Sequence, residues 1–211
     1  MYLFTRTTRL AGGNGAEGVE WATEAAGKVK EITGNDLELW AGVFGPGFGT
    51  IMWTAWYADL KALETAGDTL QGDASYEQVV SRGAQLTEGG FDDGLIQLIH
   101  GEPDPSRELQ YVGSVQAVCA AGNVSRAMEL GVEIADAASS ATGLSTLFAR
   151  GLTGPYGGVG WMTGYENIEQ YQEAQDAIAA DEAMMRLVDS TAGVFAEDPA
   201  VTQAALLRKL A

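Results

Sequence analysis

Two short stretches of the sequence place large apolar side chains and a threonine at alternating positions. The first holds Met52, Thr54 and Trp56, and the second holds Trp161, Thr163 and Tyr165. In a strand such residues share one face, and apolar walls with a few hydroxyls are typical of a cavity for a small apolar or aromatic molecule. The alternative is that the aromatic rings fill a closed core, where the threonines need buried hydrogen-bond partners.

A cation falls in the middle of an expected strand of the second region. This residue is Arg150, in a chain with only 12 Lys and Arg residues. A guanidinium stays charged and can bind an anionic or enolate-like oxygen, whereas the alternative is an ion pair with a neighbouring carboxylate. We take Arg150 and Tyr165 as candidate catalytic residues, and Arg150 joins the six alternating residues as a candidate substrate-binding residue. Arg6 and Arg9 on the first strand raise the same question.

Single histidine and cysteine residues restrict the chemistry further. With one His and one Cys the chain has neither a histidine-rich metal site nor an intrachain disulfide. We expect His100 at the surface and Cys119 as a small buried apolar residue. No cofactor and no metal are expected.

The charge of the chain limits its partners. The 12 Lys and Arg residues stand against 29 Asp and Glu, a formal net charge of −17, which disfavours nucleic acid and anionic membranes. No signal peptide and no long apolar stretch is apparent, so we expect a cytoplasmic protein. It is expected to act as a monomer or a homodimer.

An internal repeat organises these residues. With a shift of 109 residues, Tyr2 meets Tyr111 and Thr54 meets Thr163, and the match includes the turns Gly45-Pro46 and Gly154-Pro155. A shift of 108 then pairs the residues from Tyr57 onward. We therefore expect a first repeat at 1–101, a linker at 102–107 and a second repeat at 108–211.

Each repeat has the same expected order of elements. Alternation and helical periodicity predict strands at 2–10 and 109–119, helices at 17–33 and 124–142 that end at Gly34 and Gly143, and hairpins at 37–57 and 145–165. Two further helices are expected to break at Asp73 and Asp181. Last strands follow at 94–99 and at 202–210, where a helix is equally compatible with the sequence. The order is β-α-β-β-α-β, twice.

This order is the ferredoxin-like motif, and its tandem arrangement resembles the dimeric α/β-barrel superfamily, with its NIPSNAP-like and antibiotic-biosynthesis-monooxygenase-like groups. The resemblance implies an α+β fold in which both repeats of one chain form a pseudo-dimeric α/β barrel. On the first strand the polar set Leu3, Thr5, Thr7 and Arg9 is then expected to face the barrel interior, and the set that includes Phe4 and Arg6 to face the helices.

Two kinds of function follow. The first is a protein that binds a small apolar or aromatic molecule, with the resemblance implying a cofactor-independent monooxygenase or an isomerase. The second is a non-catalytic structural or interaction module whose barrel is filled by side chains.

Overall fold

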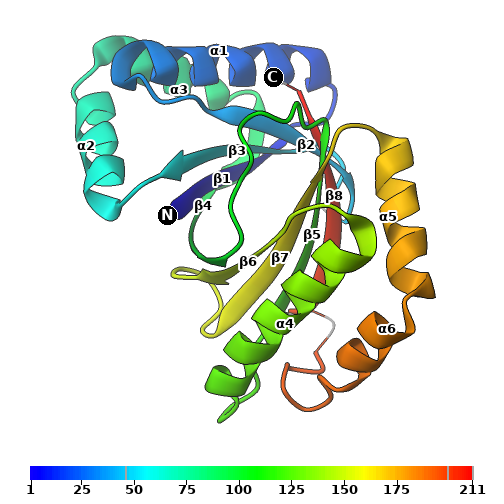
Figure 1. Ribbon diagram of the computed structural model, residues 1–211. Helices are drawn as coiled ribbons and strands as arrows, with labels where there is room; N and C mark the ends of the chain where they lie inside the picture. Colours follow the sequence, from blue (N-terminus) through cyan, green and yellow to red (C-terminus); the bar gives the residue numbers. More distant parts are fainter. Residues whose placement is uncertain (46, 199, 211) are drawn as a thin grey trace. The chain divides into compact units, whose positions relative to one another are not determined.

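The computed structural model describes residues 1–45, 47–198 and 200–210 (Figure 1). It divides into two compact units, one of Met1–Leu95 with Arg208–Ala211 and one of Ile96–Leu207. We call these unit 1 and unit 2. The divisions fall within two strands, β4 (Thr87–His100) and β8 (Gln203–Lys209). The repeat boundaries expected from the sequence stay a prediction.

The elements follow the predicted order. The first seven are β1 (Tyr2–Leu10), α1 (Gly15–Thr33), β2 (Glu38–Phe44), β3 (Thr50–Tyr57), α2 (Leu60–Gln71), α3 (Ala74–Gly83) and β4 (Thr87–His100). The next seven are β5 (Tyr111–Val118), α4 (Val124–Thr142), β6 (Thr146–Gly151), β7 (Gly158–Tyr165), α5 (Ile168–Ala180), α6 (Glu182–Asp189) and β8 (Gln203–Lys209). The last segment is thus a strand, and β4 begins seven residues earlier than expected, at Thr87 where position 94 was predicted.

The strands pair in antiparallel fashion. In unit 1, β3 lies between β1 and β2, and in unit 2, β7 lies between β5 and β6 while Ile96–His100 of β4 pairs with β6. The order of all eight strands is β1-β3-β2-β8-β5-β7-β6-β4, that of a closed barrel. The predicted α+β fold, with two tandem ferredoxin-like repeats contributing to one barrel, is therefore confirmed.

Glycine and aspartate residues set the helix ends where the sequence places them. Gly34 and Gly143 follow α1 and α4 in the left-handed conformation, with φ of 77° and 69°, which glycine adopts without steric cost. Asp73 and Asp181 interrupt the second helical stretch of each unit. Each accepts hydrogen bonds from the first turn of the next helix, α3 or α6, as a good N-cap does.

Equivalent tryptophans on β3 and β7 anchor each sheet to its first helix. Trp53 donates its indole N–H to the carbonyl of Ala22 on α1 (3.0 Å), and Trp161 donates to Gly131 on α4 (2.8 Å). Trp161 therefore corresponds to Trp53, a shift of 108 residues. The sequence comparison paired it with Met52, and this pairing was wrong by one residue.

The extra residue lies in the hairpin turn, before β3. Gly45 and Gly154 have matching φ of 97° and 85° at a shift of 109, whereas Gly49 and Gly157 match at 83° and 79° at a shift of 108. Pro46, which the sequence comparison used to align this turn, lies outside the described residues. Because side chains alternate along a strand, a one-residue error exchanges the two faces.

The helices of unit 1 cover one face of its strands (Figure 1). Arg6 lies opposite Trp53 in the β1–β3 register, and Thr5 lies opposite Thr54. Since Trp53 bonds to α1, Arg6 shares the helix-covered face, as the sequence indicated, and Thr5 and Thr54 lie on the other face. The core of this layer contains Trp21, Ala22, Leu39, Ile51 and Trp53. Among the described residues, none of the helices is long and apolar enough to cross a membrane.

Candidate functional site

A cavity of about 300 Å³ lies within unit 1, between the helix-covered face of β1 and β3 and the helices α1, α2 and α3. This volume is at the lower end of the range found for small-molecule sites. Most of its wall is apolar. The aromatic and polar residues of the wall are Phe4, Arg6, Trp21, Trp53, Tyr57, Gln71, Tyr76 and Phe91.

Three aromatic rings form one side of the cavity. Trp21 meets Trp53 edge to face with ring centroids 5.5 Å apart, and Phe91 lies 6.4 Å from Trp21 and 6.2 Å from Trp53. The indole N–H of Trp21 donates to the carbonyl of Val79 (2.8 Å), and that of Trp53 is bonded to α1. With their polar atoms engaged, both indoles present apolar faces, which suit a flat aromatic ligand.

Arg6 brings a positive charge to this wall. Its Nε and Nη2 atoms donate to the two carboxylate oxygens of Asp93 at 2.7 and 2.6 Å, and Nη1 donates to the hydroxyl oxygen of Tyr76 at 3.5 Å. The guanidinium also lies 5.7 Å from the ring centre of Phe4 and 5.4 Å from that of Phe91. The hydrogen bonds that Arg6 donates to Asp93 raise the pKa of the guanidinium. The cation is thus held in one orientation by a two-pronged ion pair and by aromatic faces.

Tyr57 places a hydroxyl in the same cavity. The residue is only 6% exposed, and burial raises the pKa of its phenol, so the hydroxyl stays protonated at neutral pH. Tyr57 lines the cavity, so a bound molecule can reach its hydroxyl. The Tyr76 hydroxyl accepts from Arg6 and keeps its own proton to donate. Two hydroxyl donors and a guanidinium can therefore meet a ligand oxygen that carries negative charge.

The three candidate residues of unit 1 lie outside this cavity. Met52, Thr54 and Trp56 follow the register of β1 and β3 onto the face away from α1. Thr54 is buried and accepts a hydrogen bond from the indole of Trp40 at 3.0 Å. This bond supplies the partner that a buried threonine needs. The assignment of these residues to a binding site stays a prediction.

The four candidate residues of unit 2 fall into two groups. Trp161, Thr163 and Tyr165 share the helix-covered face of β7, and the hydroxyl of Thr163 lies 2.8 Å from that of Thr146. Arg150 is exposed and donates to the side-chain oxygen of Gln97 at 2.9 Å, so its partner is an amide instead of the carboxylate that the sequence suggested. Their roles in binding or catalysis also stay predictions.

The remaining chemistry-bearing residues lie in unit 2. The side chain of His100 is 35% exposed, and its Nε2 atom lies 2.7 Å from Oδ1 of Asp136. Partial burial raises the pKa of the Cys119 thiol, which suits the expected role as an apolar filler. Within residues 1–45, 47–198 and 200–210, no three His, Cys, Asp or Glu side chains are grouped as a metal site would need.

The cavity was missed because the candidate residues of the first repeat, Met52, Thr54 and Trp56, lie on the other face of the strands. A usable signal was the difference between the repeats. Arg6 lies opposite Trp53 as Val115 lies opposite the equivalent Trp161, so a cation stands in one repeat where the other has valine. A charge that only one repeat carries on its helix-covered face is not required by the fold that both repeats share.

Comparisons with known proteins place the fold but not the activity. No family model and no curated protein matches the chain. A candidate monooxygenase of Fusobacterium nucleatum has a similar structure, with a TM-score of 0.73 and 11% identity over 100% of this chain and 92% of that one. An anthrone oxidase-like protein gives 0.69 and 11% over 100% and 91%. A candidate monooxygenase of Lactobacillus acidophilus gives 0.64 and 9% over 99% and 93%. These likenesses show that the chain shares its fold with these three proteins.

Proposed function

We propose that the cavity of unit 1 binds a small, flat aromatic molecule that carries a phenol or enol oxygen, and that the protein oxygenates this molecule with dioxygen. The observation that carries the proposal is that Arg6, in contact with the Tyr76 hydroxyl, shares the wall of a largely apolar cavity with Tyr57. Similar folds in candidate monooxygenases and an anthrone oxidase-like protein support the choice of reaction.

The polar groups of the cavity suit a ligand that is itself acidic. The described lining contains no carboxylate, histidine or lysine, and the carboxylate of Asp93 next to it is engaged by Arg6, so none of the lining side chains is an ordinary general base. An isomerase that removes a proton from a weakly acidic carbon needs such a base. A phenol or enol of low pKa loses its proton more readily, and Arg6, Tyr57 and Tyr76 stabilise the resulting anion by charge and hydrogen bonds. We therefore favour oxygenation over isomerisation.

In the proposed reaction, the substrate supplies all the electrons. The anion has its reactive carbon in conjugation with the bound oxygen, and that carbon bonds to dioxygen to give a peroxide. The peroxide O–O bond then breaks, the carbon loses its remaining C–H proton, and a carbonyl and water are produced. A methylene group and dioxygen thus become a carbonyl and water, so one oxygen atom enters the product and the other leaves as water.

The test uses dihydroxyanthrone, a phenolic tricycle with one reactive methylene. We expect faster dioxygen uptake in the presence of the protein than in buffer, and one heavy oxygen atom in the new carbonyl when the gas is isotopically labelled. Tyr57→Phe removes only a hydroxyl and should lower the rate by about tenfold, the loss expected for one hydrogen bond to a charged oxygen.

A matched control tests whether the loss is specific to the cavity. Thr8→Val alters another buried hydroxyl of unit 1, outside the cavity wall, and should leave the rate unchanged. If the wild-type protein binds dihydroxyanthrone without accelerating its oxidation, the proposed oxygenation is wrong and the cavity only sequesters or senses an aromatic molecule. If it neither binds nor oxidises any phenolic tricycle, the proposal fails.

A further inference from the structure

We infer that the chain binds its ligand in unit 1 alone, and that Tyr171 closes the corresponding space of unit 2. The inference rests on the proposed function, because it concerns how many of the proposed sites one chain holds. A duplicated fold leads to the expectation of two equivalent sites. The side chains at matched positions indicate only one such site.

Matched positions are fixed by contacts that both units share. Asp59 caps α2 by accepting from the N–H three residues later, and Asn167 caps α5 in the same way. The shift of 108 between these caps pairs Leu63, which lines the cavity of unit 1, with Tyr171. The strand registers pair Tyr57 with Tyr165, since each ends its strand opposite the first tyrosine of its unit.

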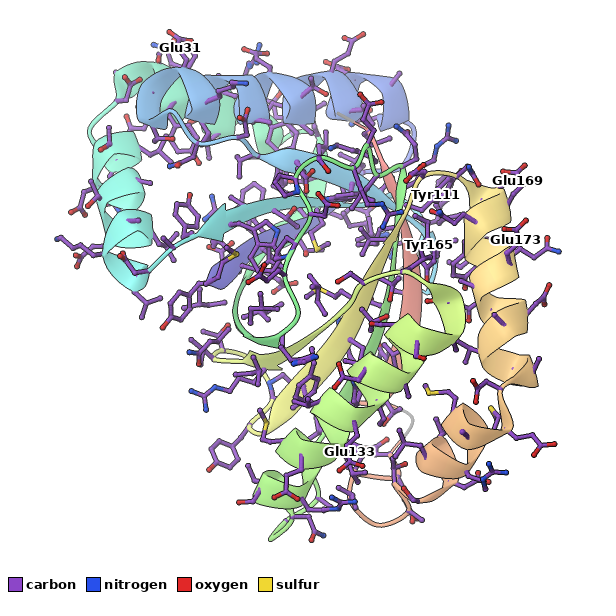
Figure 2. All side chains as sticks on the ribbon, in the orientation of Figure 1. Glu31, Tyr111, Glu133, Tyr165, Glu169 and Glu173 are labelled. Atoms are coloured by element: carbon purple, nitrogen blue, oxygen red, sulfur yellow. The ribbon has the colours of Figure 1, made fainter. Side chains whose placement is uncertain are left out.

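The ring of Tyr171 occupies the space beside Tyr165. The two rings meet edge to face with centroids 5.2 Å apart and planes at 88°, and Tyr165 is only 3% exposed. Both rings lie over Gly113, because a Cβ atom there would be 3.2 Å from Tyr165 and 3.6 Å from Tyr171. Figure 2 shows Tyr165 on its strand next to α5, with Glu169 and Glu173 along that helix. In unit 2 a protein side chain thus fills the position that borders the cavity in unit 1.

The groups that would recognise a ligand oxygen are also absent at the matched positions. Val115 replaces the cation Arg6. Met184, buried at 6% exposure, replaces Tyr76, since each is the third residue after a capping aspartate. Unit 1 has three groups that can bind a ligand oxygen, Arg6, Tyr57 and Tyr76. At the matched positions unit 2 keeps only one of them, the tyrosine, as Tyr165. Filling by Tyr171 and loss of the polar groups lead to the same conclusion independently.

The experiment measures stoichiometry and location together. α-Naphthol, a two-ring phenol, is titrated calorimetrically into the whole protein, and fluorine NMR follows the same titration on protein labelled with fluorotryptophan. We expect one molecule bound per chain, with shifted signals for Trp21 and Trp53 and an unshifted signal for Trp161. Assignments come from single Trp→Phe variants. Two molecules per chain, or a shifted Trp161 signal, would overturn the inference.

Exchanging the two matched residues tests the role of Tyr171 directly. Leu63→Tyr introduces into unit 1 the ring that fills unit 2, and we expect it to weaken α-naphthol binding at least about tenfold. Tyr171→Leu should leave the affinity for α-naphthol and the single-site stoichiometry within about twofold of wild type, because Val115 and Met184 supply no polar partner. A second molecule bound by Tyr171→Leu at similar affinity would contradict the argument. Absence of any binding to the wild-type protein would instead count against the proposed function.

Discussion

Two glycines in contact with large rings permit a matched test of the cavity wall. A Cβ atom at Gly83, the last residue of α3, would lie 2.1 Å from the indole of Trp21, and one at Gly131 on α4 would lie 2.0 Å from the ring of Phe148. Real Cβ atoms stay beyond 3.0 Å, and ordinary contact begins at 3.4 Å. Gly83→Ala therefore forces Trp21 to shift, and Gly131→Ala forces Phe148 to shift. Both rings belong to the core of their unit.

The expected energies follow from two opposing terms. Overpacking a core costs about 1–3 kcal/mol, whereas replacing glycine by alanine inside a helix gains up to about 1 kcal/mol. At Gly83 the helix is ending, so the gain is small and we expect a net loss of about 1–2 kcal/mol of unfolding free energy. Gly27 on α1 has nothing within 4 Å of its missing Cβ. Gly27→Ala is therefore a control, expected to stabilise by about 0.5–1 kcal/mol.

Binding separates the two overpacked variants. Because Trp21 lines the cavity and Phe148 does not, Gly83→Ala should weaken α-naphthol binding by about tenfold, and Gly131→Ala should leave it unchanged. Urea unfolding gives the stabilities, and tryptophan fluorescence follows the titration. If Gly83→Ala binds and unfolds like Gly27→Ala, the close packing of Trp21 on α3 is refuted. If Gly131→Ala weakens binding equally, the cavity of unit 1 is not the binding site.

Three further predictions concern single residues. Arg6→Lys should weaken α-naphthol binding by about three- to tenfold, because lysine lacks the planar donors that hold Asp93. Calorimetry measures this affinity, and an unchanged value would contradict the role of Arg6 in binding. Burial raises the pKa of Tyr57, so above about pH 10 the folded state keeps a proton that the unfolded state releases, and the unfolding free energy should fall as the pH rises. Urea titrations of Tyr57→Phe should show a smaller fall. The same dependence of unfolding free energy on pH in the variant and the wild type would contradict this prediction. Asp181→Ala removes the acceptor for the N–H groups of Ala183 and Met184 (2.8 and 2.9 Å); a loss of about 1 kcal/mol in unfolding free energy is expected, with unchanged ligand affinity.

The element order could be predicted because local signals decide it. Gly34 and Gly143 end helices by their left-handed backbone, and Asp73 and Asp181 break the second helical stretch by capping the next helix. These effects depend on a few neighbouring residues, so a single sequence reveals them. The α+β class and the tandem repeat follow from their order.

The site could not be predicted in the same way, since it depends on a register that local signals leave open. The two hairpins, Gly45-Pro46-Gly47-Phe48-Gly49 and Gly154-Pro155-Tyr156-Gly157-Gly158, match equally well with the extra residue before or after β3. The bonds from Trp53 to Ala22 and from Trp161 to Gly131, together with the matching φ of Gly49 and Gly157, place it in the turn. A one-residue slip exchanges faces, which is why Trp161 was grouped with Met52 and the candidates of the first repeat fell on the face away from α1.

The charge of the chain bears on the form in which the ligand arrives. With a net charge of −17, the chain repels an anion at distances beyond a Debye length of about 8–10 Å, although Arg6 attracts one inside the cavity. The proposed substrate should therefore enter as the neutral phenol and lose its proton next to Arg6. Stopped-flow fluorescence tests this order. The association rate of α-naphthol at neutral pH should not change with ionic strength, whereas that of a nitrophenolate, already ionised in solution, should rise about severalfold as salt screens the repulsion. A nitrophenolate that binds fastest at low salt would show instead that the anion is steered into the cavity, and the neutral-entry order would be wrong.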